Sequence, residues 1–305
     1  MSSMTRIGVI GAGRVGAVLA AALRAAPGHR EIVAVSGESK VARNRIETLL
    51  PGVPVDKPTA VARSCDLLLL TVPDDMLGNV VNMLSASGAI RPEQYVAHTS
   101  GRHGLAVLDP AAALGAQVLA MHPAMTFTGT EIDLQRLSGC VFAVTATQQS
   151  QALAASLVAD LGGSMVPVPE DRRTLYHAGL AHGANHLVTV VSQAMDMLRE
   201  SGADDPAGTL RPLLTAALDN ALSSGDAALT GPVARGDVNT VRAHLADVAA
   251  RAPTTLESYV VLARATANRS VLNGRLLPIR AAKIIGVLND ALDAAPRVSS
   301  RGGIA

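Results

Sequence analysis

The segment Gly8–Leu23, GVIGAGRVGAVLAAAL, constrains the fold of this chain more than any other. A short apolar run leads into Gly11, Gly13 and Gly16 at G-x-G-x-x-G spacing, and an alanine-rich helical stretch follows. Such glycines permit a tight turn, close approach of a pyrophosphate to the backbone, and close packing of helix on strand. A second strand-like run follows within about thirty residues. The segment therefore predicts a βαβ unit that holds a dinucleotide.

The first half of the chain alternates strand-like and helix-like runs, which is typical of an α/β fold. We expect a doubly wound Rossmann-like parallel sheet followed by an all-helical second domain, because no strand signal remains after Thr174. The predicted dinucleotide-binding domain covers residues 4–169. A helical substrate and dimerisation domain follows over 170–295, and 296–305 form a mobile tail. The expected strands are Arg6–Ile10, Glu31–Val35, Asp66–Val72, Tyr95–Thr99, Gln117–Met121, Cys140–Thr145 and Met165–Pro169.

Composition limits the function classes. With 305 residues, 49% hydrophobic and 17% charged, the chain is globular and long enough for two domains. A net charge of +1 and 2% aromatic residues do not favour a nucleic-acid partner. The sequence shows no signal-peptide pattern and no apolar run of membrane-spanning length. Cys65 and Cys140 lack CxxC spacing. We therefore expect a cytoplasmic protein without disulfides or membrane contact.

The residues after the second expected strand bear on the choice of cofactor. An NAD site usually places Asp or Glu at the strand end, where it bonds the ribose hydroxyls, but here the strand ends in Ser36. Ser39, Lys40 and Arg43 follow and suit a 2′-phosphate, so NADP is the expected cofactor. Two alternatives stay open: Glu38 bonds the ribose of NAD from the loop, or Lys40 and Arg43 form an ordinary solvated helix face.

Other cofactor contacts are expected around the same sheet edge. Arg14 and Val15 open the first helix, whose N-terminus suits phosphate groups. Val72 and Pro73 close a strand where ligands bind in such sheets. We interpret the following Asp74–Asp75 as caps of the next helix rather than a catalytic pair, because Asp is a preferred N-cap residue.

Two further strand ends carry polar groups for a substrate. In HTSGRHG, the Ser100 hydroxyl and neighbouring N–H groups suit a carboxylate, and the absence of G-x-S-x-G argues against a serine hydrolase. In MHPAMTF, His122 either faces the crevice or packs against the rim of the sheet. Both residues are expected in the substrate site.

The run Thr174–Val191, TLYHAGLAHGANHLVTVV, opens the helical half. On a regular α-helix His177 and Asn185 share a face and His186 points away from it, so His177 and Asn185 are the expected catalytic residues. His182 and His186 have the i, i+4 spacing of a metal pair, but the glutamate of H-E-x-x-H and a third ligand are missing. We therefore expect no metal. Packing of these histidines between helices is the remaining alternative.

Six motifs in this order resemble a bacterial family of largely uncharacterised two-domain proteins: GVIGAGRVG, TVPDD, HTSG, HPAMTF, YHAGLAHGANH and LTGPVARGD. The resemblance spans roughly Thr5–Asp293. It implies a Rossmann-like NAD(P)-binding domain followed by a helical domain of unknown function. The architecture is similar to that of ketopantoate reductase, pyrroline-5-carboxylate reductase and the β-hydroxyacid dehydrogenases, a 6-phosphogluconate-dehydrogenase-like fold that commonly dimerises through the helices.

The likeness to ketopantoate reductases implies roles for single residues. The lysine that serves as general acid in those enzymes corresponds to His177, and the asparagine eight residues later corresponds to Asn185. Their second asparagine, midway between the two, corresponds to Ala181, whose side chain is inert. A histidine can also protonate a developing alkoxide. The guanidinium of Arg235 suits a substrate carboxylate; alternatively it pairs with Asp237.

These observations predict an NADP-dependent reductase of a small oxo acid, with ketopantoate as the first compound to test. The hydride passes to the carbonyl carbon, His177 protonates the oxygen, and Asn185 orients the substrate or the histidine. An imine reductase of the pyrroline-5-carboxylate type and a non-catalytic NADP-binding sensor or scaffold remain as alternatives. Apolar helix surface after Thr174 predicts a homodimer.

Overall fold

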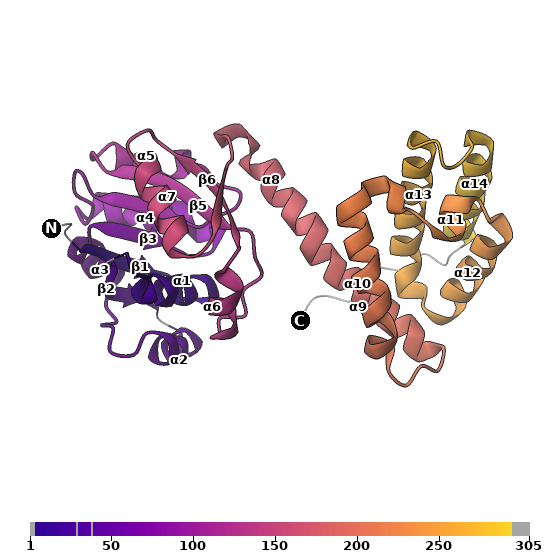
Figure 1. The fold of residues 1–305 in the computed structure, drawn as a ribbon, viewed down its shortest axis with the longest axis horizontal. Coiled ribbons are helices and arrows are strands. Elements are labelled where there is room, and N and C mark those ends of the chain that lie inside the picture. Colours follow the sequence, from indigo (N-terminus) through magenta and orange to yellow (C-terminus); the bar gives the residue numbers. More distant parts are fainter. Residues whose placement is uncertain (1–3, 29, 38, 295–305) are drawn as a thin grey trace. The chain divides into compact units, whose positions relative to one another are not determined.

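The computed structural model describes residues 4–28, 30–37 and 39–294. The chain folds into two compact units, and the boundary between them lies between Ala184 and Asn185. Figure 1 shows the first as an α/β unit and the second as helices alone. The division lies beyond the expected boundary at 169 and 170, because the first residues of α8 (Arg173–Leu180) pack into the α/β unit. The tail predicted over 296–305 lies outside the described residues, as does Glu38.

The first unit is built on a seven-stranded sheet with the strand order β2-β1-β3-β4-β5-β6-β7. The chain runs from β1 to β2 and then back past β1 to β3, which places a topological switch point between β1 and β3. The strands are β1 (Thr5–Ile10), β2 (Arg30–Ser36), β3 (Leu67–Leu70), β4 (Tyr95–His98), β5 (Gln117–Pro123), β6 (Val141–Ala146) and β7 (Ser164–Pro167). The predicted Rossmann-like α/β fold is confirmed.

One pairing departs from the expected parallel sheet, because β6 runs antiparallel to β5. The connection over residues 124–140 contains only the six-residue helix α6 (Ile132–Leu137). A parallel return needs a crossover that carries the chain back along the whole sheet, and so short a helix does not provide it. The other pairings are parallel: β1 with β2 and with β3, β3 with β4, β4 with β5, and β6 with β7.

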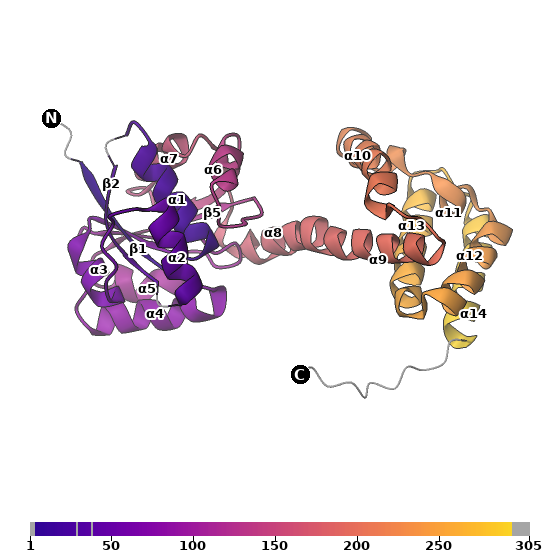
Figure 2. The same cartoon turned by 90° about the horizontal axis from the view of Figure 1, so that it is seen from below.

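Helices cover both faces of the sheet, as Figure 2 shows. Alternate residues of β3 enter opposite cores: Leu67 and Leu69 pack toward α1 (Arg14–Ala25), and Leu68 and Leu70 pack toward α4 (Asp74–Ala86). A strand with a continuous apolar run is the pattern expected of burial on both faces. The other helices of this unit are α2 (Lys40–Leu49), α3 (Pro58–Ser64), α5 (Asp109–Ala112), α6 and α7 (Gln151–Asp160).

The predicted caps Asp74 and Asp75 occupy a different position, because the N-cap of α4 is Pro73. Both aspartates lie in the first turn of α4, where the helix dipole stabilises negative charge. Their carboxylates also pair with Arg102, at 3.6 Å from Asp74 and 3.1 Å from Asp75. The pair is therefore structural in this conformation.

The described residues of the second unit, from Asn185 to Ala294, form helices joined by turns, with no strand among them. Its core is built mainly from α12, α13 and α14, with Val241, Val260 and Ile284 fully buried. No helix in the described part of the chain combines the length and hydrophobicity needed to cross a bilayer. The helices are α9 (His186–Glu200), α10 (Pro206–Ser224), α11 (Gly231–Arg235), α12 (Val238–Arg251), α13 (Leu256–Leu272) and α14 (Pro278–Ala294).

Candidate functional site

The glycine-rich turn joins β1 to α1 and is held against the end of β2. The Gly11 N–H donates to the Ser36 carbonyl at 3.0 Å, and Gly11 has a φ of +94°, a conformation open to glycine. A side chain at Gly16 would lie 2.6 Å from the Gly11 carbonyl oxygen and would overlap Thr71. The protein's own packing therefore requires the first and third glycines.

Gly13 has a different role. A Cβ atom there would meet only the Gly11 carbonyl oxygen, at an ordinary 3.7 Å, so packing within the protein does not demand a glycine. Gly13 is also the N-cap of α1, and no side chain caps that helix. Uncapped N–H groups beside a position without a side chain fit the phosphates of a dinucleotide.

A cleft of about 660 Å³ opens at this turn, at the carboxyl ends of β1, β3 and β4. Ligands bind at this edge in open α/β sheets, next to the switch point, and the volume is in the range of small-molecule sites. The loop after β5 supplies Met125, Thr126 and Phe127 as a further wall. The predicted site residues that line the cleft are Gly11, Gly13, Arg14, Val15, Val72, Pro73 and Ser100.

The residues predicted to hold a 2′-phosphate lie apart from this lining. Ser36 is buried and contributes its carbonyl to the glycine turn. The Ser39 hydroxyl caps α2 by accepting from Ala42 N–H at 3.1 Å. Lys40 is exposed in the first turn of α2, and Arg43 lines a separate hollow beside the end of that helix. Their recognition of a phosphate stays a prediction.

The wall after β5 is organised by a buried acid that the sequence reasoning missed. Asp133 is fully buried. Its carboxylate accepts from the Thr128 N–H at 2.8 Å, from the Gly129 N–H at 2.7 Å and from the Thr128 hydroxyl at 3.1 Å. Three such bonds satisfy a carboxylate away from water. The TGTEID run after the β5 motif was the available signal, since Asp with nearby Thr and Gly commonly forms such turns.

Two histidine rings meet directly beyond the Ser100 end of the cleft. A Cβ atom added to Gly101 would lie 2.5 Å from Cδ2 of His177 and 3.1 Å from Cδ2 of His122. The two rings are edge to face, with centroids 5.8 Å apart. The His122 Nδ1 is 3.0 Å from the Tyr176 hydroxyl. Gly101 therefore makes room for a His122–Tyr176–His177 cluster at the sheet edge, and Tyr176 is a member that the sequence reasoning missed.

His98 is nearby but is committed to the fold. It is fully buried, its Nδ1 accepts from the Ser100 N–H at 3.1 Å, and its Nε2 donates to the Gly104 carbonyl at 2.8 Å. Both ring nitrogens are thus used by the loop that follows β4. The Ser100 hydroxyl in turn accepts from the His103 N–H at 3.1 Å, so its lone pairs are partly occupied at the end of the cleft.

The start of α8 carries an arginine that is buried without a carboxylate. Arg173 is 0% exposed and donates to the Ser100 carbonyl at 2.7 Å and to the Thr145 hydroxyl at 2.9 Å. Its Nε finds no hydrogen-bond partner among the described residues. Burial lowers the pKa of this guanidinium, yet arginine stays protonated in proteins. The cation therefore lies within the fold beneath Ser100.

The two inner histidines are held neutral. Burial, followed by the positive fields of His177 and Arg173, lowers the pKa of His122 to about 4. Burial also lowers the pKa of His98 to about 4, against the opposing effect of its bond to Gly104. Neutral imidazoles act as hydrogen-bond donors and acceptors rather than as cations at physiological pH.

Acid should therefore destabilise the protein through these histidines. An unfolded chain takes up their protons near pH 6.5, whereas the folded protein resists until about pH 4. Above about pH 6.5 these histidines do not reduce the free energy of unfolding. That free energy falls as the pH drops from 6.5 toward 4. At pH 5 we expect a loss of about 2 kcal/mol for each histidine. Urea unfolding at pH 7 and at pH 5 measures this loss of unfolding free energy. His122→Asn should reduce the loss by about 2 kcal/mol, the part due to one histidine. An unchanged slope in that variant would contradict the assignment.

The helix predicted to be regular through Asn185 contains a π-helical segment, Ala181–Asn185. Its wider turn removes the angular argument that set Asn185 on the His177 face and His186 opposite. Asn185 begins the second unit, so its catalytic role stays a prediction. His182 and His186 make contacts within the protein, and no group of three or more possible metal ligands occurs among the described residues.

Arg235 lies at the end of α11 and already has a partner. Its Nη2 is 2.8 Å from Asp237, and both side chains are largely exposed. This is the pairing that the sequence left open as an alternative to a substrate clamp. A solvent-exposed pair of this kind contributes little to stability.

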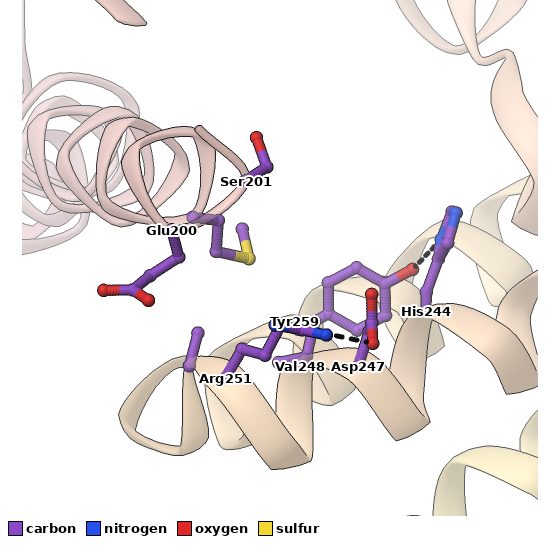
Figure 3. A pocket seen from close by; sticks show the side chains of 9 residues that line it. Glu200, Ser201, His244, Asp247, Val248, Arg251 and Tyr259 are labelled. Carbon is purple, nitrogen blue, oxygen red and sulfur yellow. Dashed lines mark hydrogen bonds and ion pairs between the residues drawn. The ribbon is translucent and has the colours of Figure 1, made fainter. Parts of the chain in front are cut away.

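The second unit has a cavity of its own, of about 580 Å³, between the end of α9 and helices α12 and α13. Figure 3 shows the Tyr259 hydroxyl joined to His244 and Arg251 joined to Asp247. Glu200 and Ser201 are drawn there without a dashed line to the other residues, and the Ser201 hydroxyl donates to the Leu198 carbonyl at 2.8 Å. None of the predicted site residues lines this cavity.

Comparison with known proteins supports both halves of the architecture. A Rossmann-like domain family matches residues 2–123, and a family described as a domain of unknown function, DUF2520, matches residues 140–266. No curated protein sequence matches this chain.

Solved structures share the fold at low sequence identity. A Bacteroides fragilis protein described as a candidate NADP oxidoreductase is 20% identical, with a TM-score of 0.73 over 87% of this chain and 98% of that one. Pyrroline carboxylate reductase of Plasmodium falciparum with NADP bound is 12% identical, with a TM-score of 0.55 over 93% and 98%. A reductive aminase of Aspergillus terreus with NADPH is 16% identical, with a TM-score of 0.56 over 95% and 94%. The chain is therefore similar to the Rossmann-like family over residues 2–123 and to the DUF2520 family over residues 140–266, and it shares the fold of these oxidoreductases.

Proposed function

We propose that this protein is an NADP-dependent reductase of a small oxo acid, with ketopantoate the first substrate to test. The observation that carries the proposal is the position of His177. Its ring packs on Gly101, the residue after Ser100, which lines the end of the dinucleotide-sized cleft. A group able to donate a proton thus lies where the reacting end of a bound dinucleotide would be.

The turn and cleft assign the cofactor contacts. Gly13, Arg14 and the uncapped N-terminus of α1 would hold the pyrophosphate, and Val72 and Pro73 would flank the chain of the dinucleotide. NADPH, when bound, supplies the hydride. The NADP or NADPH named with the fold neighbours supports NADP over NAD, and contact of Lys40 and Arg43 with its 2′-phosphate stays a prediction.

The residues of the chain then handle the oxygen and the carboxylate. As hydride adds to the carbonyl carbon, the π electron pair moves to the oxygen, and His177 donates the proton that makes the alcohol. Ser100 and the N–H groups of its loop would receive the substrate carboxylate. The roles predicted for Asn185 in orienting the substrate and for Arg235 in pairing with its carboxylate stay predictions.

A panel of 2-oxo acids followed at the absorbance of the reduced cofactor tests the proposal. Ketopantoate and pyrroline-5-carboxylate belong in the panel, each with NADPH and with NADH. We expect NADPH to be preferred by roughly tenfold to a hundredfold, the value of one charge-assisted contact. Equal use of NADH would remove the NADP assignment. Cofactor binding without turnover of any compound would favour a sensor or scaffold instead.

Reduction of an imine is the second candidate. The fold neighbours named as pyrroline carboxylate reductase and reductive aminase favour it. The same hydride donor serves either bond, so the panel separates the two candidates by the substrate that is turned over.

We also infer a homodimer formed through the second unit. The fifteen residues of α9 include no buried one, and α10 buries only Pro206 and Leu210. Large apolar side chains are exposed on both helices, with Val188 at 66% and Leu222 at 79%. Exposed apolar surface on this scale is typical of an interface. Light scattering at micromolar concentration tests it, and a monomer would contradict it.

A further inference from the structure

The acids around the histidine cluster are already neutralised. Asp74 is paired with Arg102, with 3.6 Å between the carboxylate and Nε. The carboxylate of Glu170 accepts from the N–H groups of Leu105 and Ala106, at 2.6 and 3.1 Å. Neither carboxylate forms an ion pair with Arg173, although both charges act on its guanidinium from a distance and oppose the lowering of its pKa by burial.

Arg173 has no carboxylate in direct contact. Its two hydrogen bonds go to the neutral oxygens of Ser100 and Thr145, and it forms no ion pair within the described part of the chain. A buried charge is normally paired, because its removal from water costs several kcal/mol. An unpaired one at the edge of a ligand cleft leaves a positive field at that edge.

The two candidate reactions respond to this field in opposite ways. An oxo acid brings a carboxylate, and its reduction places new negative charge on the carbonyl oxygen, which then takes a proton. Pyrroline-5-carboxylate also brings a carboxylate, but its protonated imine adds a positive charge, and hydride addition consumes that charge with no proton transfer. A fixed cation near the proton donor His177 stabilises the first transition state and opposes the iminium charge of the second substrate.

We propose that Arg173 is the specificity-determining residue of the site, and that it selects anionic carbonyl compounds against compounds that carry the positive charge of an iminium group. The inference rests on the proposed reductase function and decides between its two candidate substrate classes. Arg173 acts from within the fold through its charge, without touching the substrate, and it holds the carbonyl of Ser100 at the end of the cleft. Ser100 and the rings of His122 and His177 would contact the ligand.

Binding of small probes tests the charge without a known substrate. The full chain loaded with NADP⁺ is titrated with oxamate, an anionic carbonyl compound, and with pyrrolidinium, a cation of similar size. The ring ¹³C signals of His122 and His177, assigned with His122→Asn and His177→Ala, report occupancy of this site. We expect oxamate to shift both signals and to bind at least tenfold more tightly than pyrrolidinium. Equal or tighter binding of pyrrolidinium to the native protein would overturn the proposal.

Two variants separate the charge from the packing. Arg173→Lys keeps the charge and should bind oxamate within a few-fold of the native protein. Arg173→Met removes it and should weaken oxamate by about tenfold to a hundredfold, with pyrrolidinium unchanged or tighter. Thermal unfolding checks that each variant is folded, and if Arg173→Met is not, the comparison of probes on the native and lysine proteins still decides. Oxamate affinity equal in both variants would overturn the proposal.

The binding result is independent of turnover. If no panel compound is reduced, the proposed reductase function fails, whereas selective capture of the anion at the two histidines would still support the charge assignment. If oxo acids are reduced but the probes bind without charge preference, only the role of Arg173 fails.

Discussion

Replacing His177 by alanine should lower kcat for the oxo acid by 10²- to 10⁴-fold, the usual contribution of a general acid. The affinity for NADPH should stay within a few-fold, because His177 does not line the cleft at the glycine turn. Gly101 and His122 pack against its ring, so loss of the ring leaves a space at the sheet edge rather than a disrupted core. Steady-state kinetics with the substrate from the panel, together with calorimetric titration of NADPH, measure both effects.

His244→Ala is the matched control. His244 lies on α12 of the second unit and bonds to Tyr259 at 2.9 Å, so its removal should leave kcat unchanged. A His177→Ala protein that turns over normally would show that the acid is another group. His98 is then a poor substitute, because both of its ring nitrogens are bound within the fold. His122 and Ser100 would be the next residues to test.

Alanine at Gly16 and alanine at Gly13 should have different consequences. At Gly16 the methyl group would overlap Thr71 and press on the backbone of Gly11. Overpacking of this kind costs about 1–3 kcal/mol, so both the melting temperature and NADPH affinity should fall. At Gly13 φ is −78°, outside the left-handed region that favours glycine, and an added methyl group would meet no close neighbour. Stability should therefore change by less than about 0.5 kcal/mol, the usual range for a site without packing conflict, while NADPH affinity drops on the order of a hundredfold.

Thermal unfolding and calorimetry of the two variants measure this separation. Gly286→Ala, in the interior of α14 with open space around its Cα, controls for the general effect of replacing glycine. It should be neutral or stabilise by up to about 1 kcal/mol. If Gly13→Ala binds NADPH as tightly as the native protein does, the phosphates do not approach the turn. That result would contradict the assignment of the cofactor to this cleft.

Local patterns predicted the framework of the molecule. The G-x-G-x-x-G turn, the order of strands and helices, and the change to helices after the sheet all depend on neighbouring residues. Strand alternation and helical periodicity act over only a few positions. The prediction that Gly13 meets a ligand rather than the protein also follows from the motif, and the space around its Cα agrees with it.

Regularity was the assumption that failed. The parallel sheet and the regular helix through Asn185 are the simplest continuations of local patterns, yet β6 pairs antiparallel with β5 and a π-helical segment interrupts the helix at Ala181–Asn185. The direction of a strand depends on the path of its connection, and the width of a helical turn depends on what it packs against. Neither is encoded in the periodicity of apolar residues.

The sequence by itself determined the dinucleotide turn, the α/β-then-helical architecture and the set of polar residues at the sheet edge. Tertiary structure alone decided their roles. His98 is enclosed by its own loop, and His122 bonds to Tyr176 and contacts the ring of His177 over Gly101. Arg173 is buried without a carboxylate in direct contact. The physical reason is that burial, pairing and pKa depend on segments brought together from β4, β5 and α8. Residue type and spacing specify which groups are present, whereas the electrostatic surroundings that give each group its function arise only when these segments pack.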